Sequence, residues 1–224
     1  AVCSALTPTS SVLPAGARKT SSQWHPDWRL EAKVAQPGKL TTKVYNGQPD
    51  PFNANAVASC APATALLPDG KPIVVLCKQV EQATTDASGA LGFSAVVQAG
   101  VTNRVQQWTY NEFGQMLTGK DALNNTTAYA YHAATTLDVT KGDLASVTNA
   151  KGQVRSYPSY DRHGNWLSMT DANGVVTTRT FDARQRLKTQ VVAGRTTGYD
   201  YFPTGLLKQV TQPDLSWVGY EYDG

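Results

Sequence analysis

The chain has 224 residues, which is enough for one large β domain or two small ones with a real core. Charged residues make up 17%, and the formal net charge is only +3 without a run of like charges, which is too weak a field to argue for nucleic acid or an anionic membrane as the main partner, so we expect no nucleic acid. The apolar stretch from Ile73 to Cys77 is far too short to span a bilayer. The chain begins at Ala1 without Met and without a basic leader, so we expect a processed chain or a fragment.

Residues 1–39 are predicted to form an extended N-terminal segment that acts as a plug. The segment is rich in Ser, Thr, Ala and Pro and contains Trp24 and Trp28. Exposed rings at these two positions could stack on sugars, which makes them the candidate glycan-binding residues. Wedging the segment against a sheet is the interpretation that we favour.

Residues 40–105 are predicted to be a β-rich lead-in with degenerate repeats. Thr41 to Tyr45 alternates like a strand and runs into Asn46-Gly47, which predicts a tight hairpin. Gln48 to Asn55 is predicted to be a long loop, and Ile73 to Gln79 a second strand. The segment from Thr85 to Gly89 resembles the turns of the later repeats.

Cys60 and Cys77 flank a Pro- and Ala-rich segment of this lead-in. A disulfide between them would stabilise the fold by roughly 3 kcal/mol and would place the protein outside a reducing cytosol. Two buried free thiols are the alternative. Cys3 is left over, either free or paired between chains.

Residues 106–224 contain tandem repeats. An aromatic residue opens each unit, and Asp or Asn, then a turn Gly, follow it in the better copies. The steps from Tyr110 to Tyr131, from Tyr160 to Phe181 and from Tyr201 to Tyr222 are each 21 residues. A constant period predicts one supersecondary unit copied along the chain. The repeat positions are Tyr110, Gly114, Tyr131, Gly142, Tyr160, Asp161, Gly164, Phe181, Asp182, Tyr201, Gly205, Tyr222 and Asp223.

Each unit is predicted to be a β-hairpin. Apolar residues fall two and five positions after the turn glycine, as at Trp166 and Met169. A polar turn such as Thr170 to Gly174 comes next, and the returning strand carries aromatic residues two positions apart on one face. Neighbouring hairpins are expected to stack these rings in ladders.

Two departures from the period predict local differences. Ala133 to Thr140 is an insertion, which predicts a longer surface loop. The unit at Phe181 has Gln185 in place of Gly and Val192-Ala193-Gly194 in place of the usual second turn, so a tighter turn is expected there.

No catalytic set, metal-ligand spacing or cofactor motif is found, so we predict no enzyme activity, no metal and no cofactor. The recurring carboxylates Asp161, Asp182, Asp200 and Asp223 each precede a turn, where Asp bonds local amides rather than calcium. Trp108 and Trp166 fall at positions that are apolar in other repeats and are predicted to be core rings.

The repeats resemble the Rhs or tyrosine-aspartate (YD) repeat family. The resemblance lies in Tyr-Asp-x-x-Gly, an apolar residue two positions on, a Thr-Asp-x-x-Gly turn and a returning Tyr-x-Tyr-Asp, and the copy from Tyr160 to Phe181 matches best. Membership implies an all-β fold in which tandem β-hairpins form a curved, spiralling antiparallel sheet, part of a hollow β-shell. In bacterial members such a shell encloses a toxic C-terminal domain. A full shell needs many more repeats than this chain holds, and the self-cleaving aspartyl motif that ends such shells is missing.

Three functions are therefore expected in order of preference. The first is a non-catalytic structural segment of an Rhs/YD-repeat protein that builds a β-shell around a toxin domain or presents it. The second is a cell-surface adhesion or glycan-binding module, and the third is a self-assembling extracellular fibre subunit. The expected partners are other repeats or other copies of the chain through sheet edges, an enclosed toxin domain, and glycans. The expected location is secreted, extracellular or at the cell surface.

Overall fold

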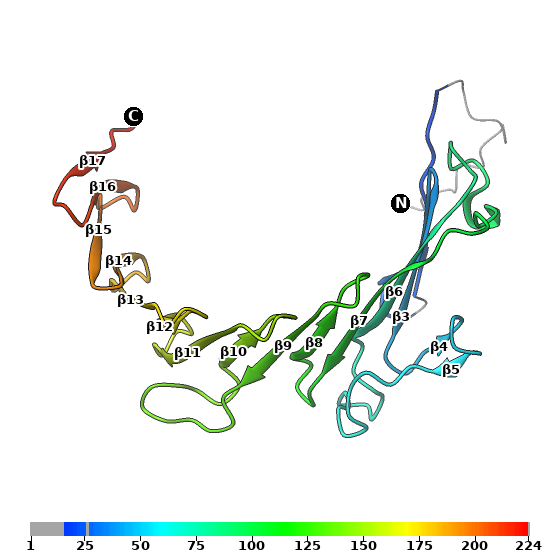
Figure 1. The fold of residues 1–224 in the computed structure, drawn as a ribbon, viewed down its shortest axis with the longest axis horizontal. Coiled ribbons are helices and arrows are strands. Elements are labelled where there is room, and N and C mark those ends of the chain that lie inside the picture. The colour runs from blue at the N-terminus through cyan, green and yellow to red at the C-terminus, as the bar shows by residue number, and fades with distance from the viewer. Residues whose placement is uncertain (1–15, 26, 224) are drawn as a thin grey trace, which may run out of the picture. The chain divides into compact units, whose positions relative to one another are not determined.

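The computed structural model describes residues 16–25 and 27–223, and within them the protein is all-β apart from one short 3-10 turn, Gly92–Ser94 (Figure 1). It divides into two compact units, Ala1–Thr126 and Thr127–Gly224. No helix in the described part of the chain has the length and apolar character needed to cross a membrane. The all-β architecture of antiparallel hairpins expected from the repeats is confirmed.

The first unit contains a six-stranded antiparallel ladder in the order β1-β2-β3-β6-β7-β8. A separate pair, β4 with β5, lies in the long connection between β3 and β6. The strands are β1 Ser21–Trp24, β2 Glu31–Gln36, β3 Lys39–Tyr45, β4 Pro49–Asp50, β5 Ala56–Val57, β6 Leu76–Ala83, β7 Arg104–Tyr110 and β8 Met116–Lys120.

The buried core of the first unit is small and lies on β2, β3 and β6 and on the connection that carries Ala61 and Ala65. Ala35, Val44 and Val80 are each at most 2% exposed, and Tyr45 and Cys77 are nearly as well buried. These side chains belong to neighbouring, paired strands, so the ladder is held by apolar burial as well as by its backbone hydrogen bonds.

The second unit continues as hairpins in strict sequence order, β9 to β17. Each strand from β10 to β16 pairs antiparallel with the strand before it and the strand after it. The strands are β9 Thr126–Tyr131, β10 Leu144–Thr148, β11 Val154–Tyr160, β12 Trp166–Thr170, β13 Val176–Phe181, β14 Leu187–Val192, β15 Arg195–Tyr201, β16 Leu207–Thr211 and β17 Trp217–Gly219. Figure 1 shows them following one another in colour from green to red.

The second unit has almost no buried interior. Among its described residues only Val139 and Thr177 are buried, while the remaining strand residues are half-buried or exposed. Its strands contact their sheet neighbours and no second layer of the described chain. Backbone ladders and side-chain pairs on the two faces therefore carry its stability.

Several predictions from the sequence differ from the structure. The predicted tight hairpin at Asn46-Gly47 is wrong, because β3 pairs with β2 and with β6, which returns only at Leu76. Asn46 is buried and uses its side chain to join two loop segments. The strand predicted at Ile73 to Gln79 is found a few residues later, as β6.

The described part of residues 1–39 contains β1 and β2, for which no strand was predicted. Their short sequences give little apolar alternation to mark a strand, and pairing fixes them instead, β1 with β2 and β2 with β3. Cys3 lies outside the described residues. The three sequence segments 1–39, 40–105 and 106–224 remain a prediction, and the compact units divide the chain at Thr126.

Candidate functional site: the repeated turn and its tyrosine

A five-residue turn connects successive strands at eight places in the described chain. In residues 161–165 the amide of Asp161 donates to the carbonyl of Asn165 at 2.8 Å, and the amide of Gly164 donates to the carbonyl of Asp161 at 3.1 Å. The same two bonds close residues 111–115, 121–125, 149–153, 171–175, 182–186, 202–206 and 212–216. The sequence repeat is thus a repeat of one backbone conformation.

The fourth residue of this turn has positive φ, which explains the turn glycine. Gly164 has φ +84° and Gly174 has φ +79°, a region that costs most side chains energy. Gln185 takes the same conformation at φ 64° without being glycine. The tighter turn expected at Ala193-Gly194 is present, with positive φ at both residues and Val192 paired directly with Arg195, as in a type I′ hairpin.

The repeat aspartate holds the turn from inside. Oδ1 of Asp161 accepts from the amides of His163 at 2.8 Å and Asn165 at 3.0 Å, and Oδ2 accepts from the Asn165 side chain at 3.0 Å. Asp121, Asp171 and Asp182 accept from the amides two and four residues on in the same way. Asp161 and Asp182 thus take the turn role expected of them, whereas Asp200, of which the same role was expected, lies within β15 and pairs with Gln209.

These hydrogen bonds favour the ionised carboxylates. The pKa of Asp182 is lowered by the Arg186 side chain first, and then by the amides of Arg186 and Arg184. Burial alone would raise the pKa of Asp161, but the bonds from Asn165 and His163 outweigh it, so the pKa is lowered. No group of metal-ligating side chains forms among the described residues.

A bulge follows each of the first turns and explains the apolar spacing. Tyr160 pairs with Trp166 and Ser159 with Ser168, so Leu167 is the extra residue. Lys188 and Lys208 are the extra residues at the equivalent places in β14 and β16. Residues three apart in a regular strand point to opposite faces, and the bulge brings them to one face.

The repeat tyrosine fastens each strand to the start of the strand before it. Tyr160 at the end of β11 donates its hydroxyl to the carbonyl of Leu144 at 2.7 Å. Tyr201 donates to Leu187, and Tyr222 to Leu207, both at 2.9 Å. In the first unit Tyr45 and Tyr110 do the same to the carbonyls of Glu31 and Leu76. We call this contact the tyrosine clamp.

The clamped tyrosines are partly shielded from water, except Tyr222, which is exposed. Burial, followed by the charges of Asp143 and Tyr157, raises the pKa of Tyr160 to about 12, so its hydroxyl stays protonated and able to donate at neutral pH. Phe181 occupies the same place without a hydroxyl and cannot make the bond.

Side chains also join successive turns along one sheet edge. Asn165 donates to the Gln185 side chain at 2.7 Å, and Arg184 donates to the carbonyl of Pro203 at 2.6 Å. The Arg186 guanidinium lies over the Tyr201 ring, 4.4 Å from its centre. These contacts hold the turns at 161–165, 182–186 and 202–206 beside one another.

The two faces of the second unit differ in chemistry. Paired Ser and Thr residues follow one face, including Ser146 with Ser156, Ser168 with Thr178, and Thr180 with Thr189, whose hydroxyl oxygens are 2.6 Å apart. On the other face Arg179 lies 3.8 Å above the Trp166 ring, and Tyr157 packs edge-on against that ring. Trp166, expected to be a core ring, is half-buried in this surface cluster, and Trp108 is also half-buried.

The insertion at 133–140 is a loop, as expected, and it packs against the repeat that follows. The carbonyl of Asp138 accepts from the amide of Tyr160 at 2.7 Å, and Val139 is buried. In the first unit the carbonyl of Cys60 accepts from the amide of Tyr110 in the same way, at 2.8 Å. In both units, a backbone carbonyl of the inserted loop thus accepts a hydrogen bond from the amide of the tyrosine that ends a strand beside a bulge.

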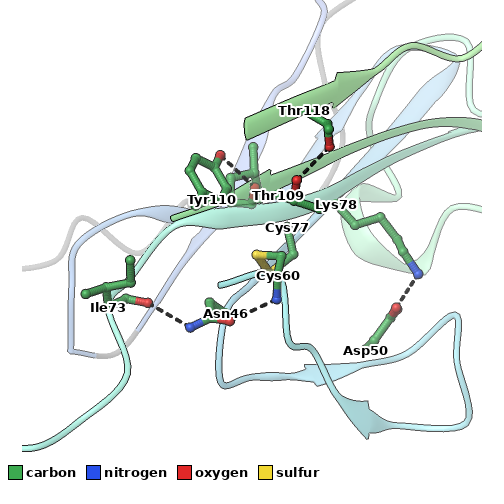
Figure 2. Close-up of a disulfide and its surroundings, with 10 residues drawn as sticks. Asn46, Asp50, Cys60, Ile73, Cys77, Lys78, Thr109, Tyr110 and Thr118 are labelled. Atoms are coloured by element: carbon green, nitrogen blue, oxygen red, sulfur yellow. Dashed lines mark hydrogen bonds and ion pairs between the residues drawn. A yellow bond between two sulfur atoms is a disulfide. The ribbon is translucent and has the colours of Figure 1, made fainter. Parts of the chain in front are cut away.

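The long connection from β3 to β6 is stapled to the sheet by Cys60 and Cys77, which form a disulfide with 5.4 Å between their Cα atoms. Figure 2 shows Asn46 beside it, accepting from the amide of Cys60 at 3.1 Å and donating to the carbonyl of Ile73 at 3.2 Å. Lys78 forms an ion pair with the buried Asp50. The connection is thereby fixed at three points.

Of the two candidate glycan-binding residues, only Trp24 lines a cavity. Trp24 is 56% exposed and lines a cavity of about 320 Å³, whereas Trp28 is 39% exposed and does not line it. The other residues of this cavity come from β1, β2, β3 and the following loop.

Comparison with known proteins identifies the repeats. Residues 138–176 and 160–197 match the family model described as RHS Repeat. A search of curated proteins found no match. The solved structure of TcdB2-TccC3 aligns with 88% of this chain and 12% of its own, at 15% identity and a TM-score of 0.40.

A second structure, of TcdB2-TccC3 without its hypervariable C-terminal region, aligns with 88% of this chain at 14% identity and the same TM-score of 0.40. A Tc holotoxin pore structure from Photorhabdus luminescens has 14% identity and a TM-score of 0.29. The chain spans only 11 to 12% of the length of these solved chains. By its sequence and the recurring geometry of its hairpins, the segment 138–197 of this chain is made of RHS repeats.

Proposed function

We propose that this chain is a non-catalytic wall segment of an Rhs/YD-repeat protein, and that the wall encloses or presents a toxin domain. The observation that carries the proposal is the second unit, a one-layer sheet of RHS repeats with scarcely a buried residue among those described. Such a sheet is suited to building a surface by repetition, because each hairpin supports its neighbours through local bonds.

The difference between the two faces supports a wall with two environments. Hydroxyl pairs, with Val154 and Val176 among them, follow one face, whereas the opposite face carries the Trp166 and Tyr157 rings beside Arg179. A sheet that divides two compartments needs faces of different chemistry, while a free-standing ribbon gains nothing from the asymmetry.

The bulges support curvature of that wall. A bulge bends its strand and increases the local twist, and here one follows the first turn of each repeat at Leu167, Lys188 and Lys208. Curvature repeated at a constant period is what a closing or spiralling sheet requires.

An oxidising location agrees with this role. The Cys60–Cys77 disulfide fixes the connection between β3 and β6, and such bonds persist in secreted and surface proteins. We therefore place the protein outside the cell or at its surface.

Protease protection of the natural full-length protein tests the proposal. Any domain enclosed by the wall should resist protease until the wall is weakened by combining Tyr160→Phe, Tyr201→Phe and Asp161→Ala. A matched variant, Tyr199→Phe, alters a tyrosine on the same strand that makes no clamp and should keep the protection. Equal digestion of that domain in the natural protein and in the weakened variant would overturn the proposal.

A further inference from the structure

His25, which lines the same cavity as Trp24, has an unused hydrogen-bond donor. His25 is only 6% exposed, and its Nδ1 accepts from the amide of Asp27 at 3.2 Å. With Nδ1 occupied as an acceptor, the neutral ring carries its proton on Nε2. Nε2 is buried and has no hydrogen-bond partner in the described part of the chain. A buried donor without a partner is costly, and a ligand oxygen would satisfy it.

The charges around this cavity favour an anion. Lys33 and Lys43 line it, and none of its lining residues is acidic. Lys43 is engaged by Glu31 at 2.9 Å, while Lys33 forms no ion pair with any described residue. The Lys33 ammonium can therefore form an ion pair with a carboxylate of the ligand.

The remaining lining residues suit a hydroxylated ring. The exposed Trp24 side chain supplies a flat apolar surface of the kind that packs on the less polar face of a sugar. Gln48 and Asn55 add amide groups that both donate and accept, and the Tyr45 ring packs edge-on against His25 at 6.2 Å. The cavity volume of about 320 Å³ is that of a small-ligand site.

We propose that this cavity binds an acidic saccharide, with Trp24 stacked on a pyranose ring and Nε2 of His25 and the ammonium of Lys33 directed to its oxygens. All residues that line the cavity belong to the first unit, and none belongs to the RHS repeats at 138–197. The proposal therefore does not depend on the wall function.

Calorimetric titration of the whole chain with trigalacturonic acid tests the proposal, and the methyl-esterified trisaccharide serves as a neutral probe of the same shape. The acid should bind with a dissociation constant below about 1 mM, a range in which calorimetry measures weak ligands. The ester should bind several-fold more weakly, because esterification removes the charge that faces Lys33.

Three variants assign the residues. Trp24→Ala should weaken binding of the acid roughly tenfold by removing the stacked ring. Trp28→Ala is the matched control and should leave the affinity unchanged, because Trp28 does not line the cavity. Lys33→Gln should reduce the preference for the acid over the ester. Circular dichroism confirms that each variant is folded.

The opposite results would overturn the proposal. Absence of binding heat with millimolar acid would exclude the site. Equal affinity for acid and ester would exclude an acidic ligand, and loss of binding in Trp28→Ala with retention in Trp24→Ala would place the binding residue elsewhere.

Discussion

The tyrosine of each repeat acts through its hydroxyl as well as its ring. Tyr160, Tyr201 and Tyr222 have the same partner type, the carbonyl of the leucine that begins the preceding strand. A ring alone could supply the packing, as Phe181 shows. The hydroxyl adds a directional bond that ties non-adjacent chain segments, and this explains why tyrosine recurs at the position.

Tyr201→Phe should therefore lower the free energy of unfolding by about 1 kcal/mol, the usual value of one hydrogen bond. Tyr199→Phe is the matched control, because the Tyr199 hydroxyl has no bond to a described residue, and it should have little effect. Urea unfolding followed by circular dichroism measures both. Similar losses in the two variants would show that the clamp adds nothing.

The turn aspartates predict a stability that depends on pH. The pKa of Asp182 is lowered in the folded state, mainly by the hydrogen bond from the Arg186 side chain. Ionised Asp182 therefore stabilises the folded state relative to the unfolded state. Its contribution is present above the unfolded pKa of about 4 and is lost as the pH falls through the folded value. The urea midpoint should drop between pH 5 and pH 3, roughly the range of carboxylate titration.

Asp182→Asn should make this pH dependence shallower, because the amide keeps an acceptor oxygen for the turn but does not titrate. Identical pH profiles of the two proteins would contradict a role of Asp182 in it.

The turn glycines predict a cost for any side chain. Gly164 has φ +84° with open space around it, so Gly164→Ala should cost about 1–2 kcal/mol through backbone conformation alone. Gly198→Ala is the control, because Gly198 lies in β15 without positive φ and a Cβ there would make an ordinary 3.8 Å contact with Thr211. Thermal unfolding should separate the two variants, and an equal loss in both would contradict the conformational explanation.

At the scale of elements, the hairpins could be predicted well because their determinants are local. The Asp161 turn depends on a carboxylate, two amides and a glycine within five residues, and all of these are readable in sequence. Glycine is not required in every copy, because Asn124, Gln185 and Leu215 also have positive φ at the fourth turn position, and the side chain of Gln185 is held there by Asn165.

The remaining features depend on register and could not be predicted in the same way. The acceptor of the Tyr201 hydroxyl lies 14 residues away, and only the strand pairing identifies it. The bulge accompanies apolar residues three apart, such as Trp166 and Met169, but this spacing identifies a bulge only when the partner strand and its register are known. The dipeptide Asn46-Gly47 predicts a hairpin that is not formed, because the Asn46 side chain instead bridges Cys60 and Ile73.

The disulfide should be the strongest single constraint on the connection from β3 to β6. It closes a loop with a sequence separation of 17, so the double variant Cys60→Ala/Cys77→Ala should lose roughly 3 kcal/mol on the chain-entropy model. Urea unfolding with and without reductant measures this loss. Reductant should destabilise the natural protein and leave the double variant unchanged. A natural protein indifferent to reductant would argue against the bond.

For the whole molecule, the physical problem is how a sheet with so little buried surface stays ordered. The first unit gathers a small core on β2, β3 and β6, and the second relies on turns, clamps and cross-strand pairs. Exposed apolar residues such as Val176, Trp217 and Val218 remain on the second unit. Exposed apolar side chains of this kind make an isolated sheet prone to association.

Cryo-electron microscopy of the natural full-length protein tests the central claim most directly. We predict that residues 138–197 will appear as consecutive hairpins of one curved, single-layer wall around an interior, with each tyrosine clamp in place. Hairpins packed into a filled two-layer core, or a ribbon with both faces open to solvent, would contradict the account.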